Sequence, residues 1–211
     1  MNPLTESSLR KHPQQLRIQH RVNRVLDAAA QVFAELGFEA ATTNTIAERA
    51  DISIGSLYQY FPNKSALFQA LCQRCERESL ELLDAVITPE LARLELGEVV
   101  GRVVAALRQL YSTNPRLLRV LFQGYPAKDP SLPHSSFREA MVRRVERLLE
   151  ERWPRLEPTR RQLVAGVCFQ VADGLFDLAL LCEEGVGHRV MDELKRLLLA
   201  YLEPLEREGA G

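Results

Sequence analysis

Residues 42–61 read TTNTIAERADISIGSLYQYF, and this stretch decides the fold. Thr42 and Thr43 offer hydroxyl groups that can cap the N-terminus of a short helix. Ser53 can cap a second short helix, which the proline that follows the stretch ends. Two short capped helices separated by three or four residues predict a helix-turn-helix.

The turn between the two helices falls at Asp51, where a left-handed backbone is expected. Glycine adopts that conformation most easily, and Asp is among the few other residues that tolerate it. Ala47 lies where the helices cross, and its small side chain lets them approach closely. The apolar seam between them and the preceding helix consists of Ile46, Ala50, Ile52, Leu57 and Phe61.

The outward face of the second helix carries no charge, which is unusual for a helix that is only solvated. Gly55 and Ser56 are small enough to let a partner approach closely, and the Tyr58 hydroxyl can donate to a phosphate. Gln59 can read a base edge, and Lys64 adds a cation beside a helix N-terminus. These features favour a helix that lies in the major groove of DNA. The alternative is that the tyrosines only pack a small bundle.

Residues 42–68, TTNTIAERADISIGSLYQYFPNKSALF, resemble the DNA-binding domain of TetR-family transcriptional regulators. The family pattern has a Thr pair, I-A-x-x-A, a turn ending in V-S, then G-x-L-Y-x-Y/H-F and P-x-K-x-x-L. Asp51 departs from it, because Gly is frequent there, and Ile54 and Gln59 stand where basic residues are frequent. The matching positions are Thr43, Ile46, Ala47, Ala50, Ser53, Gly55, Leu57, Tyr58, Tyr60, Phe61, Lys64 and Leu67.

The resemblance implies roles for the matching residues on double-stranded operator DNA. The residues expected to contact the phosphate backbone are Thr43, Tyr58, Tyr60 and Lys64. The residues expected to face the bases are Ser53, Gly55, Ser56 and Gln59. From their charge alone, Arg17 and Arg21 are expected to reach the flanking minor groove.

The resemblance also implies how such a protein works. It predicts a homodimer that binds a near-palindromic operator and leaves the DNA when a small molecule enters its C-terminal domain. Repression is the commoner behaviour in the family, and activation of transcription is the alternative. A helical protein-interaction module without DNA binding is a second alternative, but it leaves the charge-free helix face unexplained.

Charge is unevenly distributed along the 211 residues, although the formal net charge is only −1. Residues 1–24 hold five basic side chains against one acidic side chain, which favours a segment that meets an anion. A solvated tail is the alternative. We expect a flexible basic arm over residues 1–19, a helix-turn-helix domain over 20–70, and a ligand-binding and dimerisation domain over 71–211.

The remaining sequence predicts helices only. From His20 to Leu36 apolar residues recur at three- and four-residue spacing, and Gly37 is expected to close that helix. No segment alternates with the period of two that marks a strand, so the fold class is all-α. The other helices are expected at about 44–50, 54–61, 64–87, 97–113, 116–124, 134–152, 159–182 and 187–202.

Several functional classes are excluded by the motifs that the sequence lacks. It has no Gly-rich phosphate loop, G-x-S-x-G or H-E-x-x-H motif, so we expect no enzyme, and no metal or cofactor. Cys72 and Cys75 could suggest zinc or redox chemistry, but no further ligands follow at suitable spacing. Charges within the apolar stretch 163–182 argue against a membrane span, and no secretory signal is visible. A cytoplasmic protein is expected.

The helix expected at 159–182 is apolar nearly all round, so it must be buried. A monomer of this size has few places to bury such a helix, which favours pairing with a second copy; a central core helix is the alternative. The resemblance likewise implies that the last two helices form a four-helix bundle with the dimer mate. The expected interface residues are Leu163, Gly166, Val167, Gln170, Gly174, Leu178, Leu194 and Leu198.

A ligand pocket is expected among the central helices, with residues 123–134 as its entrance. The mainly apolar lining predicts a small hydrophobic or aromatic effector, and ordinary core packing is the alternative for each residue. The expected lining residues are Cys75, Leu107, Tyr111, Leu118, Phe122, Tyr125, Phe137, Met141 and Phe169.

Overall fold

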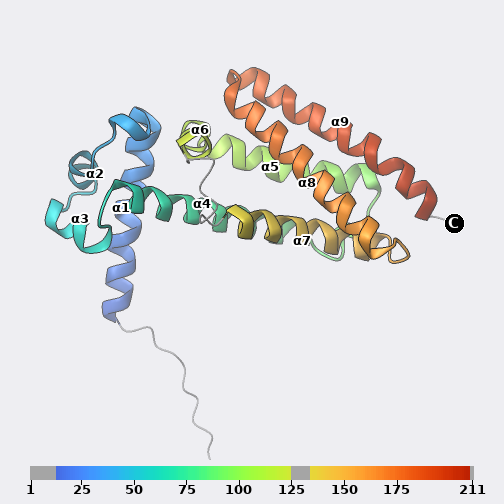
Figure 1. Cartoon of the computed structure of the whole chain (residues 1–211), viewed down its shortest axis with the longest axis horizontal. Coiled ribbons are helices and arrows are strands. Elements are labelled where there is room, and N and C mark those ends of the chain that lie inside the picture. Colours follow the sequence, from blue (N-terminus) through green and yellow to red (C-terminus); the bar gives the residue numbers. More distant parts are fainter. Residues whose placement is uncertain (1–12, 125–133, 210–211) are drawn as a thin grey trace, which may run out of the picture. The chain divides into compact units, whose positions relative to one another are not determined.

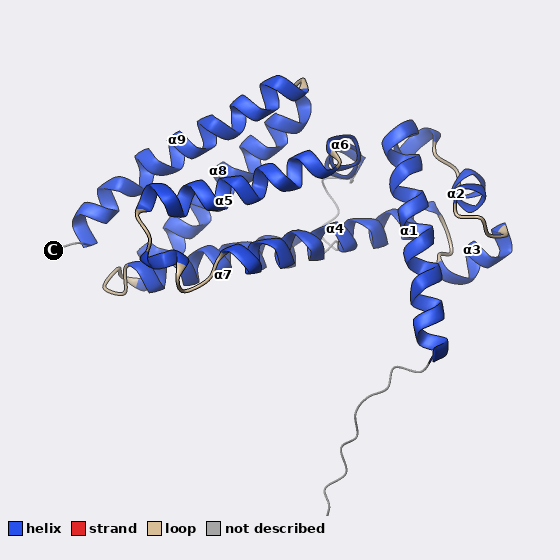
Figure 2. Cartoon of the chain, turned by 180° about the vertical axis from the view of Figure 1, so that it is seen from behind, coloured by secondary structure: helices blue, strands red, loops and turns tan. Residues whose placement is uncertain are grey.

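The structure is a computed structural model that describes residues 13–124 and 134–209. It divides the chain into two compact units, Met1–Leu71 and Cys72–Gly211. Every regular element among the described residues is a helix (Figure 2). The predicted all-α fold class is confirmed.

The N-terminal unit contains the predicted helix-turn-helix, formed by the second and third helices of the chain (Figure 1). Its elements are α1 (Pro13–Ala40), α2 (Thr43–Arg49), α3 (Ile54–Tyr60) and the first turns of α4 (Lys64–Val86).

Helix α1 begins at Pro13, earlier than the predicted start at His20. Residues 13–19 lack the apolar periodicity on which that prediction rested, but Pro is favoured in a first helical turn and Gln, Leu and Arg are good helix formers. The expectation of a flexible arm is therefore wrong for these residues, while residues 1–12 lie outside the described part. At Gly37, φ is 76° and ψ is 173°, so the regular helix is interrupted where predicted.

An aromatic cluster joins α1 to the start of α4. The ring of Phe68 lies edge-on to Phe33 and Phe38, with centroid distances of 5.3 and 4.8 Å. Ile46 of α2 and Leu57 of α3 are fully buried in the same unit. The first turns of α4 therefore share a core with the helix-turn-helix.

The C-terminal unit consists of helices that pack around a second apolar core, and α8 and α9 run side by side (Figures 1 and 2). Helix α9 extends beyond the predicted 187–202 at both ends, and Pro204 lies inside it. The elements are the rest of α4, η1 (Leu91–Arg93), α5 (Leu96–Thr113), α6 (Pro115–Gly124), α7 (His134–Arg152), α8 (Pro158–Leu181) and α9 (Glu184–Gly209).

Close packing explains the glycine near the start of α9. A Cβ atom at Gly187 would lie 2.2 Å from the Tyr111 hydroxyl oxygen and 2.9 Å from the backbone oxygen of Ala179. The Tyr111 hydroxyl donates to that same oxygen at 3.4 Å. Gly187 therefore lets α9 approach α5 and α8 closely, and Tyr111 belongs to the core at this contact.

Helix α8 is the one described helix that is long and apolar enough to cross a membrane by composition. Val164, Ala165 and Ala179 of this helix are buried within the protomer. Core helices of proteins without a membrane span share this composition, so α8 by itself is weak evidence for one.

Candidate DNA interface, dimer face and ligand cavity

The N-terminal cap of helix α2 is Thr42, so the hydroxyl group of Thr43 is not used as the cap. Thr42 has an extended backbone, and its hydroxyl oxygen accepts from the backbone N–H of Thr45 at 3.1 Å. The Thr43 hydroxyl instead lies 3.1 Å from the hydroxyl of Tyr58, on α3. Two hydroxyl groups predicted to contact phosphates are thus brought together from different helices.

The turn between α2 and α3 has the predicted left-handed backbone. Asp51 has a φ of 53° and is the one described non-glycine residue with a positive φ. Arg24 of α1 donates to the backbone oxygen of Ala50 at 2.6 Å and lies 3.7 Å from the Asp51 carboxylate. Arg24 therefore holds the turn against α1. In this chain the turn has Asp51 at the position where glycine is frequent in the family pattern.

Helix α3 exposes a face with small residues, although packing within the protein does not require small residues there. Its cap, Ser53, accepts from the backbone N–H of Ser56 at 3.1 Å, and the two serine hydroxyls lie 2.8 Å apart. Leu57 points into the core, whereas Tyr58 is 49% exposed. A Cβ atom at Gly55 would meet nothing within 4 Å, so the protein itself has room for a side chain there.

Three further residues, Ile54, Gln59 and Tyr60, belong to this face. Gln59 is exposed, as predicted for a base-reading residue, and Tyr60 is half-buried. Ile54 belongs to the outward face that the sequence predicted, and it is exposed, but it was assigned no contact with DNA. Its position one residue after the cap was the signal for such a contact, because the first turn of a recognition helix points at base edges.

Lys64 makes contacts that the sequence could not reveal. Its ammonium group donates to the backbone oxygens of Phe38, Glu39 and Ala41 at 2.7, 3.1 and 3.0 Å, and lies 4.5 Å from the Phe38 ring centroid. These three bonds occupy all three ammonium donors. A phosphate contact, which stays a prediction, would compete with the bonds that hold the end of α1.

Replacing Lys64 with Met is therefore expected to lower the free energy of unfolding by about 2 kcal/mol, the scale of hydrogen bonds to a charged group. Urea denaturation measures the loss, and hydrogen exchange should show faster exchange at residues 38–41. Lys195→Met, at an exposed position of α9, is the control and should change little. Unchanged stability in Lys64→Met combined with weaker DNA binding would contradict this role and favour the phosphate contact.

Arg17 and Arg21 are exposed on α1. Because they are four residues apart in a helix, their side chains lie on one face. They are thus presented by a helix and not by a flexible arm.

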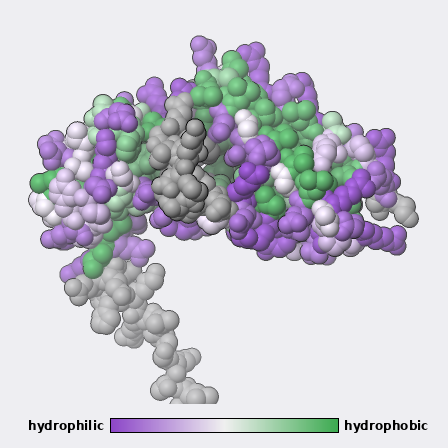
Figure 3. Space-filling view, in the orientation of Figure 1, coloured by the Kyte–Doolittle hydropathy of each residue, from purple (hydrophilic) through white to green (hydrophobic). Residues whose placement is uncertain are grey.

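The exposed apolar residues of the C-terminal unit gather on α8 and α9. Five large ones are exposed, and Leu163 and Leu181 reach 66% and 61%. Hydrophobic surface also runs over this part of the molecule in Figure 3. The five are Leu163, Leu178, Leu181, Leu197 and Tyr201.

The predicted dimer residues divide into two groups. On α8, Leu163, Gln170, Gly174 and Leu178 are exposed, and Gly166 and Val167 are half-buried. On α9 the prediction is wrong, because Leu194 is fully buried and Leu198 is 7% exposed in the protomer core. The exposed apolar residues of α9 are Leu197 and Tyr201, which helical spacing places at the edge of the buried stripe that contains Leu194 and Leu198.

A cavity of about 150 Å³ lies within the C-terminal unit. Five predicted residues line it, namely Leu107, Leu118, Phe137, Met141 and Phe169. Tyr111 and Cys75 do not line it, and burial raises the pKa of the Cys75 thiol to about 11. The side chains of Phe122 and Tyr125 lie outside the described residues. Sequence reasoning missed Leu83, Val103, Arg144, Arg152 and Trp153, which come from helices far apart in sequence.

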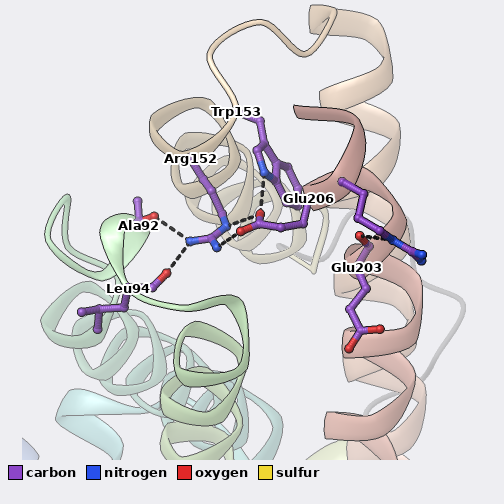
Figure 4. A network of polar contacts seen from close by, with 7 residues as sticks. Ala92, Leu94, Arg152, Trp153, Glu203 and Glu206 are labelled. Carbon is purple, nitrogen blue, oxygen red and sulfur yellow. Dashed lines mark hydrogen bonds and ion pairs between the residues drawn. The ribbon is translucent and has the colours of Figure 1, made fainter. Parts of the chain in front are cut away.

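Two arginine side chains, those of Arg144 and Arg152, line the cavity. Arg152 donates to Glu206 through Nε at 2.9 Å and also through Nη2, and it donates to the backbone oxygens of Ala92 and Leu94 (Figure 4). Trp153 donates to the same Glu206 carboxylate at 2.8 Å. Because these groups come from three separate elements, the network ties η1, α7 and α9 together.

The described residues contain no group of three or more His, Cys, Asp or Glu side chains that could hold a metal ion. The mainly apolar lining makes the cavity a candidate site for an organic ligand, and the exposed face of α3 is a candidate nucleic-acid interface.

Two family models match this chain. The model for bacterial regulatory proteins of the tetR family matches residues 25–71, and the model for the tetracyclin repressor-like C-terminal domain matches residues 95–202.

Curated relatives include two transcriptional repressors named KstR. The protein from Mycolicibacterium smegmatis is 31% identical over 129 residues, which cover 61% of this chain and 59% of the relative. The protein from Mycobacterium tuberculosis is 29% identical over 164 residues, which cover 75% of this chain and 68% of the relative. The chain therefore aligns with about three fifths to two thirds of these repressors.

Solved structures share the fold over most of the chain. A TetR-family transcriptional regulator from Streptomyces coelicolor superposes with a TM-score of 0.60 at 26% identity, covering 87% of this chain and 98% of that one. The fatty acid degradation regulator FadR from Bacillus halodurans gives a TM-score of 0.63 at 18% identity, covering 84% and 97%. At the latter identity the likeness concerns the fold alone.

Proposed function

The chain belongs to the TetR family of DNA-binding transcriptional regulators, and we propose that it is a repressor that binds a near-palindromic operator as a homodimer and is released by a small hydrophobic or aromatic effector. The observation that carries the DNA-binding part is the exposed, charge-free face of α3. Gly55 leaves this face open, and the paired hydroxyls of Thr43 and Tyr58 lie at its edge.

In this proposal, α3 enters the major groove and the hydroxyls beside it donate to phosphates. Ser53, Ser56 and Gln59 face the bases together with Ile54, whose apolar side chain suits the methyl group of thymine. Arg17 and Arg21 approach the flanking backbone or minor groove. A protein that acts on DNA in this way works in the cytoplasm of a bacterial cell.

The dimer part rests on the exposed apolar residues of α8 and α9. An isologous pairing of these helices buries the same surface on both copies. It also places two α3 helices on successive turns of one DNA face, about 34–36 Å apart.

The release part rests on α4. Ser79 and Leu83 of this helix line the cavity, and Phe68 of the same helix packs in the helix-turn-helix core. An effector that contacts the C-terminal half of α4 can therefore change the spacing of the two α3 helices.

Fluorescence anisotropy with the DNA upstream of the protein's own gene, at several salt concentrations, tests the proposal. Specific binding should weaken steeply with salt, because phosphate contacts release counterions. Gly55→Leu should weaken binding at least about tenfold by blocking close approach to the bases, a loss of the size of one good base contact. Gly97→Leu is the matched control, since a Cβ atom there also meets nothing within 4 Å but lies on α5.

The outcomes separate the alternatives. Binding only to a selected palindrome would indicate a distant target, and activation of a reporter gene would reverse the sign of regulation. No specific binding to any DNA would overturn the proposal in favour of a protein-interaction module.

Tyr58→Phe is expected to weaken binding to every operator alike, by about threefold to tenfold, because it removes one hydrogen bond to a phosphate. Anisotropy with an operator and with single-base variants of it measures both affinity and base preference. Thr43→Val, which removes the paired hydroxyl, should behave in the same way. A changed base preference in Tyr58→Phe would show that this hydroxyl contacts a base.

A further inference from the structure

We infer that the cavity in the C-terminal unit selects an uncharged, mainly apolar effector over one with a free carboxylate, because the two arginine groups on its wall are already paired with Asp84 and Glu206. This inference rests on the proposed function, in which the cavity is the effector site, and it adds the charge class of the effector.

The cavity wall is apolar along most of its length. Apolar side chains from α4, α5, α7, α8 and α9 line it, including Val99, Val103, Leu110, Leu148 and Phe176. A hydrocarbon chain or ring gains free energy in such a cavity by leaving water. A carboxylate loses its water there and needs a cation in return.

Arg152 cannot serve as that cation without breaking its network. Its side chain is 9% exposed, and its guanidinium donates to both carboxylate oxygens of Glu206 and to two backbone oxygens. Four of its five N–H donors are thereby used. The charge is neutralised and the group is held in place from three sides.

Arg144 is paired in the same manner, but with a partner at the surface. Its Nε and Nη2 atoms donate to the two carboxylate oxygens of Asp84 at 2.7 and 2.5 Å, and Nη1 donates to the backbone oxygen of Ala140 at 2.9 Å. The Arg144 side chain is 15% exposed, whereas that of Asp84 is 53% exposed. The hydrogen bonds from Arg144 hold the pKa of Asp84 below its usual range, so the pair is ionised at neutral pH.

Asp173 of α8 is the third charged residue among the described residues that line the cavity. Both arginines among these lining residues are paired with carboxylates. A second anion in the cavity would meet no uncompensated positive charge from these residues.

Asp84 therefore acts as the residue that decides selectivity. Because it is exposed at the surface, its replacement by Asn removes the charge without opening the core. Arg144 is then left with an uncompensated charge beside the cavity, and a carboxylate can take the place of Asp84. Asp192→Asn is the matched control, because Asp192 pairs with Arg108 at 2.6 Å and neither residue lines the cavity.

Titration with 1-octanol and octanoate at pH 8 tests the inference, since the two probes share a chain length and differ in charge. Trp153 is the single tryptophan of the sequence and lines the cavity, so its fluorescence reports binding. The unaltered protein should bind 1-octanol at least about tenfold more tightly than octanoate, which corresponds to 1.4 kcal/mol. Asp84→Asn should bind octanoate at least about tenfold more tightly than the unaltered protein, whereas its affinity for 1-octanol should change little. Asp192→Asn should bind both probes with nearly the affinities of the unaltered protein.

Equal affinity for the two probes, or no fluorescence change with either, would overturn the inference. No gain for octanoate in a folded Asp84→Asn protein would show that Arg144 does not set the charge preference. Operator binding is measured separately by anisotropy. Charge selectivity without DNA binding would contradict the proposed function but not the inference. DNA binding without charge selectivity would contradict the inference but not the proposed function.

Discussion

Leu178→Glu is expected to give a folded monomer that binds operator DNA roughly 1,000-fold more weakly than the unaltered protein. Leu178 is 45% exposed on α8, so a glutamate there can reach water without entering the protomer core. In the proposed dimer the same position is buried against a second copy, where two unpaired carboxylates cost about 3 kcal/mol or more. Without the dimer each α3 helix binds a half-site alone.

Analytical ultracentrifugation of Leu178→Glu and anisotropy with an operator measure the two effects. The control is Leu36→Glu, which places the same charge at an exposed leucine of α1. Circular dichroism should show unchanged helix content in both variants. A Leu178→Glu protein that remains dimeric would exclude this face of α8 as the interface.

The face can be mapped further with variants of α9. Tyr201→Glu and Leu197→Glu should also dissociate the dimer, because both residues are exposed apolar side chains at the edge of the buried stripe of α9. Leu194→Glu should unfold the C-terminal unit instead, since Leu194 is fully buried in the protomer. Dissociation without unfolding in Leu194→Glu would contradict this arrangement of α9.

Arg152→Met is expected to lower the free energy of unfolding by about 3–5 kcal/mol, the usual cost of removing one partner of a buried ion pair. The change leaves Glu206 without its guanidinium partner and leaves the backbone oxygens of Ala92 and Leu94 without a donor. Methionine occupies a similar volume, so lost packing contributes little. Urea denaturation at pH 7 measures the effect.

The comparison variant is Arg102→Met. Arg102 pairs with Glu98 on the exposed side of α5 at 2.6 Å, and such surface pairs contribute only about 0–1 kcal/mol. Equal losses in the two variants would show that the Arg152 network does not stabilise the fold. Because Arg152 and Trp153 line the cavity, the same variant should also change effector binding.

The network also sets a dependence of stability on pH. Burial pushes the pKa of Glu206 upward, but hydrogen bonds from Arg152 and Trp153 outweigh burial and hold it below its usual value. A carboxyl with a lowered folded-state pKa contributes stability that is present above its unfolded pKa and is lost as pH falls through the folded value. Arg152→Met should lose less stability than the unaltered protein across this acidic range.

The sequence predicted the helix-turn-helix in detail because its signals are local. The caps at Thr42 and Ser53 bond to backbone groups three residues away, and the left-handed turn at Asp51 depends on that residue's own backbone. The exposed face of α3 follows from helical spacing once Leu57 is placed in the core. The start of α1 was missed, since helix propensity without apolar periodicity is a weak signal.

Contacts between distant residues decided the rest. Leu194 was expected at the dimer interface, but packing of α9 against α5 and α8 buries it in the protomer and leaves Leu197 exposed. Lys64 bonds to the end of α1 across more than twenty residues, and Arg152 meets Glu206 across more than fifty.

By itself, therefore, the sequence determined the all-α fold class, the family and the exposed, charge-free helix of the helix-turn-helix, because caps, turns and helical spacing act over a few residues. Only the tertiary structure decided which apolar residues of α9 are exposed, which residues enclose the cavity, and that its arginines are neutralised. These features depend on side chains that meet only after the helices have packed, and no short-range pattern records which of them will meet.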